Sequence, residues 1–217
     1  MTGQVMLRHG KADLALHGLR HGDGPSLLLL HGLGEHSPQA VPEEAAGWPG
    51  PVWALDFTGH GGSTRPNGGG YTAEVLMADA DAALRHIGGA TLLGRGLGAY
   101  VALLLAGARA EQVKGAVLAD GVGLAGGGVF PGSPMLVRAN GGEPPAPDPF
   151  ALAELSRDIR PPDYAIAYVR LAVQFSGRVD PLAISAVVRP EWLAAVCAQP
   201  GVFEAPVAEA LAQFADR

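Results

Sequence analysis

The sequence predicts an α/β protein in which a mostly parallel sheet is flanked by helices on both faces. Short apolar runs that suit strands buried on both sides alternate along the chain with segments of helical periodicity. Glycine and proline cluster between these segments, where turns are needed. The 217 residues show no internal repeat and no interdomain linker, so we expect a single domain over 1–217.

The first half of the chain begins with an alternating stretch and continues with apolar strands. Residues 4–22 alternate in polarity and predict an antiparallel strand pair that ends at the turn GDGP. In the helix expected at 71–89, apolar residues recur near a 3.6-residue period and Gly88 lies beyond its end. The other expected elements up to residue 120 are strands at 26–32, 51–57, 90–94 and 113–120, a short helix at 41–48 and a buried helix at 98–110.

The regular pattern stops between residues 121 and 149, where the sequence is rich in glycine and proline. A long irregular insertion at the C-terminal edge of a sheet is typical of a lid over a site or of a flexible loop, and we expect 121–149 to be one of these. Regular patterns return afterwards. They predict helices at 150–158, 162–175, 190–199 and 207–216, with strands at 182–188 and 201–206.

The composition argues against some classes of binding partner and some cellular locations. The formal net charge of −6 argues against nucleic acid, because a phosphate-binding surface needs a basic patch. The longest apolar run, which starts at Ala99, is too short to span a bilayer, so we expect no membrane insertion. Residues 1–14 lack the apolar segment and cleavage site of a secretory signal. We therefore expect a cytoplasmic protein.

The stretch TLLGRGLGAYVALLLA, residues 91–106, has the pattern of a strand, a tight glycine turn and a helix. In a large class of hydrolases this turn reads G-x-S-x-G, and its serine is the nucleophile. Here the turn reads Gly94-Arg95-Gly96-Leu97-Gly98. Gly96 therefore stands where the attacking hydroxyl would be.

Three segments together resemble the α/β-hydrolase family. LLLLHGLG resembles the family's strand followed by His-Gly, here His31 and Gly32, and the glycine turn at 94–98 resembles its nucleophile elbow. The resemblance extends over residues 25–120 and implies the α/β-hydrolase fold, with the site at the C-terminal ends of the strands. The third segment, VWALDFTGHGGST, resembles the family's D-x-x-G-H-G-x-S loop, here Asp56, Gly59, His60, Gly61 and Ser63.

The resemblance also implies an oxyanion hole formed by the backbone N–H groups of Leu33 and Leu97. Backbone donors do not depend on the side chain, and the start of a helix favours negative charge, so we expect this nest to survive the loss of the serine. With Gly32 and Gly96, it would bind a small ligand that is anionic or contains a carbonyl. Arg95 could pair with an anionic ligand, or it could form an ion pair that stabilises the turn.

The rest of the family's catalytic triad is missing. The resemblance implies a histidine after the last strand, but no histidine follows His86. It also implies an acid after the penultimate strand, where the sequence has Arg189 and Pro190. Asp120 could match the acid of those members that carry it after an earlier strand, but an acid with no histidine to orient has no role in this chemistry.

Other residues could supply chemistry at the same edge of the sheet. His36 or His60, paired with a carboxylate such as Glu35, Asp56 or Asp120, could activate water or remove a proton. The alternative for His31 and His60 is loop architecture, and for His36 a solvated loop position. The spacing matches no metal-ligand motif, so we expect neither a metal nor a cofactor.

Three hypotheses about function remain, and whether the protein is an enzyme is left open. The leading one is a non-hydrolytic member of the fold that binds a small molecule at the nest of Leu33 and Leu97. The second is an esterase-like enzyme that uses His36 or His60 with a carboxylate. The third is a partner-binding or structural protein whose site is vestigial.

Overall fold

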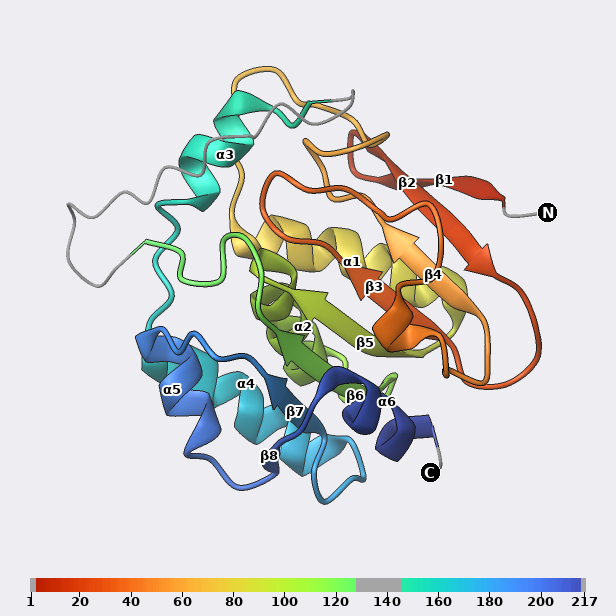
Figure 1. Ribbon diagram of the computed structural model, residues 1–217. Coiled ribbons are helices and arrows are strands. Elements are labelled where there is room, and N and C mark those ends of the chain that lie inside the picture. The colour runs from red at the N-terminus through yellow and green to blue at the C-terminus, as the bar shows by residue number, and fades with distance from the viewer. Residues whose placement is uncertain (1–2, 128–145, 216–217) are drawn as a thin grey trace.

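The computed structural model describes residues 3–127 and 146–215 and contains one eight-stranded sheet with the order β1-β2-β4-β3-β5-β6-β7-β8 (Figure 1). The strands are β1 (Gln4–His9), β2 (Ala12–Arg20), β3 (Leu27–Leu30), β4 (Val52–Leu55), β5 (Ala90–Arg95), β6 (Val113–Ala119), β7 (Leu182–Ser185) and β8 (Val202–Glu204). Strand β2 pairs antiparallel with β1 and β4, and every other pairing in the sheet is parallel. The prediction of a mostly parallel sheet is confirmed.

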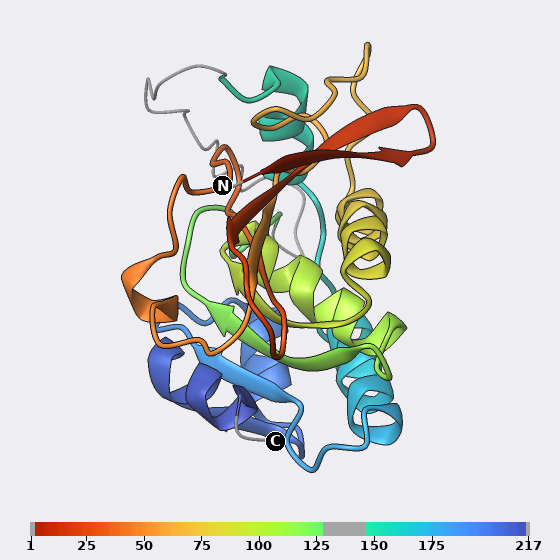
Figure 2. The same ribbon diagram turned by 90° about the vertical axis from the view of Figure 1, so that its right-hand side faces the viewer.

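Helices cover both faces of this sheet, as the sequence predicts (Figures 1 and 2). They are the 3-10 helix η1 (Glu43–Ala45) and the α-helices α1 (Ala73–Ile87), α2 (Leu97–Ala108), α3 (Pro149–Leu155), α4 (Pro162–Phe175), α5 (Glu191–Cys197) and α6 (Val207–Ala215). One face carries α1, α2, α4 and α5, and the other carries η1 and α6. A hydrophobic core lies on each face of the sheet, and strand β3 contributes to both. Leu28 and Leu30 pack into the larger core, and Leu27 and Leu29 pack into the smaller one.

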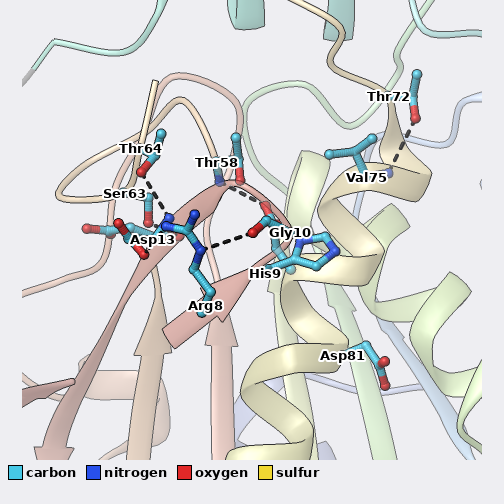
Figure 3. Close-up of polar contacts among 12 residues, drawn as sticks. Arg8, His9, Gly10, Asp13, Thr58, Ser63, Thr64, Thr72, Val75 and Asp81 are labelled. Atoms are coloured by element: carbon cyan, nitrogen blue, oxygen red, sulfur yellow. Dashed lines mark hydrogen bonds and ion pairs between the residues drawn. The ribbon is translucent and has the colours of Figure 1, made fainter. Parts of the chain in front are cut away.

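The ends of α1 show how the sequence limits its helices. Thr72 is the N-cap, and its hydroxyl oxygen accepts the N–H of Val75 at 3.3 Å (Figure 3). Gly88 caps the C-terminus in the left-handed conformation, with φ of 87°, as its place after the apolar pattern predicted. The same helix carries the buried Asp79, which pairs with His9 at the end of β1.

The β1–β2 turn is fastened to the loop that follows β4. The N–H of Asp13 donates to Thr64 Oγ1 at 2.9 Å, and Figure 3 shows this bond beside His9 and Thr58. Asp79 accepts the N–H of Thr58 at 2.9 Å and pairs with Nδ1 of His9 at 2.7 Å. These bonds hold the segment from β4 to residue 64, which contains the D-x-x-G-H-G motif, against the sheet.

Most of the segment expected to form a lid lies outside the described residues. Residues 121–127 form an irregular loop after β6, and residues 146–148 lead into α3. The lid-like role of 121–149 therefore stays a prediction. Within the described ranges, 3–127 and 146–215, no helix is both long enough and apolar enough to cross a membrane.

Candidate functional site

The tight turn predicted between strand and helix is present. Strand β5 ends at Arg95, helix α2 begins at Leu97, and Gly96 joins them with φ of 57° and ψ of −118°. Residues other than glycine rarely adopt this backbone conformation. All residues with positive φ in the described part of the chain are glycines. Gly98 lets the helix approach the strand closely, because a Cβ there would lie 2.2 Å from the carbonyl oxygen of Leu30. The elbow is thus built, without its nucleophile.

The two backbone N–H groups expected to form an oxyanion hole are already engaged. The N–H of Leu33 donates to the carbonyl oxygen of Val122 at 2.9 Å, and the N–H of Leu97 donates to the same oxygen at 3.0 Å. In this structure the two groups do not point free into a pocket, because the loop after β6 brings its own carbonyl between them. Ligand binding at the nest stays a prediction, and it would require displacement of Val122.

The same loop fills the space of the missing side chain. A Cβ built at Gly96 would lie 2.1 Å from the oxygen of Val122 and 2.6 Å from the carbonyl carbon of Gly121. Both contacts are with backbone atoms, which yield less easily than the end of a flexible side chain. We refer below to residues 121–124 as the plug.

Two buried side chains hold the plug in place. Arg160 Nη1 donates to the carbonyl oxygens of Gly123 and Leu124, at 2.6 Å each, and Trp192 Nε1 donates to Leu124 at 2.9 Å. The Arg160 guanidinium lies 4.7 Å from the centre of the Tyr100 ring, and its burial lowers its pKa to about 10. The sequence analysis missed both residues, and no motif marks them.

Arg95 makes a loose ion pair instead of facing an open nest. Its Nη2 lies 3.8 Å from Glu35 Oε1, while Glu35 Oε2 accepts the N–H of Gly32 at 2.9 Å. This is the turn-stabilising alternative considered for Arg95. The side chains of Arg95 and Glu35 are 49% and 34% exposed, so solvent screens their attraction.

Replacing Arg95 by alanine is therefore expected to change the free energy of unfolding by less than about 1 kcal/mol, as for other exposed pairs. Urea denaturation at pH 7 measures this. Arg109→Ala is the control, because Arg109 binds both carboxylate oxygens of Asp81, at 2.7 and 3.1 Å, and should cost more. A larger loss for Arg95→Ala than for Arg109→Ala would contradict this assignment.

His31 and His60 are buried, and both ring nitrogens of each face backbone groups. His31 Nε2 accepts the N–H of Phe57 at 3.1 Å, and His60 Nε2 accepts the N–H of Gly34 at 3.2 Å. Each Nδ1 faces a carbonyl oxygen, that of Gly32 for His31 and that of Thr58 for His60. Burial lowers the pKa of His31 to about 4 and that of His60 to about 3. This geometry fits the loop-architecture alternative, and it leaves His60 no free nitrogen to act as a base.

The remaining candidate catalytic residues, Asp120 and His36, lie at two separate cavities. Asp120 accepts the N–H groups of Val187 and Val188, at 2.6 and 3.2 Å, and so holds the loop after β7. It also lines a cavity of about 440 Å³ beside the plug, together with residues 121–126, Ser156 and Val188. His36 is exposed, and its Nδ1 lies 2.9 Å from the carbonyl oxygen of Ser37 at another cavity. The structure therefore does not bring His36 and Asp120 to one cavity.

Solved structures similar to this chain include several hydrolases. A hypothetical protein, PA1622 from Pseudomonas aeruginosa PAO1, is 20% identical, with 99% of each chain covered and a TM-score of 0.68. A mutant of the haloalkane dehalogenase DatA from Agrobacterium tumefaciens C58 is 17% identical, with 100% of this chain and 97% of that chain covered and a TM-score of 0.65. The thioesterase domain of the curacin biosynthetic pathway is 18% identical, with 100% and 98% covered and a TM-score of 0.60.

At these identities the similar structures show the fold alone. No curated protein matches the chain. The model of the alpha/beta hydrolase family matches residues 27–216, which includes the elbow, the D-x-x-G-H-G loop and every element from β3 to α6. The chain therefore belongs to the alpha/beta hydrolase family and has its fold.

Proposed function

We propose that the protein is a non-hydrolytic member of the family that binds a small, mostly apolar molecule in the cavity beside the plug. The observation that carries this proposal is the Val122 carbonyl, which accepts both N–H groups where the serine mechanism needs the substrate's carbonyl. Loss of a triad lowers turnover by on the order of 10⁶, and an open oxyanion hole alone retains about 10³–10⁴ over water. Because the Val122 carbonyl occupies the two N–H groups, this residual rate enhancement is lost as well.

The chemistry of the cavity favours an apolar ligand over an anionic one. Its lining of residues 120–126, Ser156 and Val188 exposes mainly carbon, and its volume of about 440 Å³ suits a small molecule. The carboxylate of Asp120 belongs to the same lining and would repel an anion. The anionic or carbonyl-bearing ligand expected from the sequence would instead have to displace Val122.

Nile red, an uncharged apolar dye, tests this proposal by its fluorescence on binding. We expect saturable binding to the wild-type protein and its loss in Ala125→Trp, because Ala125 lines the cavity and the indole would fill it. Ala46→Trp is the control, since Ala46 is exposed at the end of η1 and lines no cavity described here. Absence of saturable binding to the wild type would contradict the proposal and favour the partner-binding alternative.

A second measurement addresses the enzyme alternative. We expect no turnover of p-nitrophenyl esters above buffer and no covalent labelling by a fluorophosphonate, which reacts with activated serines. Turnover that persists through purification and falls in His36→Ala would favour relocated chemistry and overturn the non-hydrolytic proposal.

A further inference from the structure

A second cavity, of about 390 Å³, opens between β2 and the loops that follow β3 and β4. It shares no lining residue with the cavity beside the plug. Its lining consists of Gly3, Gln4, His17, Gly18, Leu19, His36, Ser37, Pro38, Gln39, Asp56, Gly61 and Gly62.

Asp56 is the buried anion of this cavity. Its Oδ1 accepts the N–H of Ser37 at 2.7 Å, and its Oδ2 accepts the N–H of Gly62 at 2.8 Å and pairs with His17 Nε2 at 3.0 Å. Burial opposes ionisation, but these hydrogen bonds outweigh it and hold the pKa of Asp56 well below its ordinary value. Because an ionised carboxylate only accepts, Nε2 of His17 must carry a proton.

The Asp56 bond leaves the other nitrogen of His17 free for a ligand. When the ring is neutral and its proton is on Nε2, Nδ1 is a hydrogen-bond acceptor. The His17 side chain is 29% exposed and lines the cavity, and Asp56 is its hydrogen-bond partner in the described part of the chain. His36 repeats the pattern, because its Nδ1 donates to the carbonyl oxygen of Ser37 and leaves Nε2 as the acceptor. The cavity thus presents two imidazole acceptors.

We propose that this cavity binds a small, uncharged, polyhydroxylated molecule such as a polyol or a sugar. Hydroxyl groups of the ligand donate to Nδ1 of His17 and to Nε2 of His36. Asp56, ionised and without a neighbouring Lys or Arg in the lining, disfavours an anion. A metal is disfavoured too, because residues 3–127 and 146–215 contain no cluster of three or more metal-ligating side chains.

Myo-inositol, D-glucose and glycerol are the probes for this proposal, followed by NMR of protein labelled at the histidine rings. We expect the His17 and His36 ring signals to shift in a saturable way with at least one probe. Inorganic phosphate and methylamine, an anion and a cation, should produce no saturable shift. A shift with phosphate or methylamine only, or with no compound, would overturn the proposal.

His17→Ala and His9→Ala form a matched pair of variants. His9 pairs with Asp79 at 2.7 Å and is 31% exposed, much as His17 is paired and exposed, but it does not line this cavity. We expect loss of probe binding in His17→Ala and wild-type affinity in His9→Ala. Equal loss in both variants would mean that binding depends on stability rather than on this cavity, and would overturn the proposal.

Discussion

Replacing Gly96 by serine is expected to destabilise the protein by about 2–6 kcal/mol and to restore no hydrolysis, although it recreates G-x-S-x-G. The new Cβ would lie 2.1 Å from the Val122 oxygen, and overpacking of this kind costs about 1–3 kcal/mol. A side chain at φ of 57° and ψ of −118° adds strain of about 1–3 kcal/mol. The restored hydroxyl would also lack a base, because His60 is buried with both nitrogens engaged.

Gly10→Ser is the control for a side chain added at positive φ without a collision. Gly10 has the same φ of 57°, but a Cβ there would meet nothing within 4 Å. Urea denaturation should therefore show a much smaller loss for Gly10→Ser than for Gly96→Ser. Wild-type stability of Gly96→Ser, or its labelling by a fluorophosphonate, would show that the plug withdraws from the elbow.

The difference in free energy of unfolding between the wild type and His60→Gln is expected to shrink as the pH is lowered. The pKa of His60 is about 3 in the folded protein, below its ordinary value of 6.5, so the unfolded chain binds more protons between these values. The stability that neutral His60 contributes is thus fully present above pH 6.5 and falls as the pH drops toward 3. At about 1.4 kcal/mol per pH unit, roughly 2 kcal/mol of the wild type's advantage should be gone at pH 5.

Comparing His60→Gln with the wild type cancels the contributions of other buried groups whose effect on stability has the opposite pH dependence. Burial raises the pKa of Asp158 to about 6 and also raises that of Asp79, so their contributions are lost as the pH rises. Both residues are unchanged in His60→Gln, and urea denaturation at pH 7.5, 6 and 5 isolates the histidine. The exposed His86→Gln serves as the control and should show no such trend. A pH-independent difference for His60→Gln would contradict the burial argument.

The fold could be predicted from the sequence because its elements are marked locally. Leu27–Leu30 is apolar at every position, which suits a central parallel strand, and Gly88 marks the end of α1. The elbow could be recognised for the same reason, since its three glycines, Gly94, Gly96 and Gly98, occupy alternate positions of one short segment.

The state of the site could not be predicted, because it depends on contacts between distant segments. The plug has no periodic pattern, and its position is set by Arg160 and Trp192, which follow it by more than thirty residues. The His17–Asp56 pair joins residues 39 apart in the sequence, across two strands. A single sequence carries no signal for either contact.

The Val122 carbonyl can also be regarded as an intramolecular ligand. It is attached through the chain, so its effective concentration at the Leu33 and Leu97 N–H groups is set by geometry and does not fall when the protein is diluted. Tethered groups on short connections reach effective concentrations of about millimolar or more. A free carbonyl compound must exceed that competition before it can occupy the nest, so weakly bound metabolites are excluded from it at ordinary cellular levels.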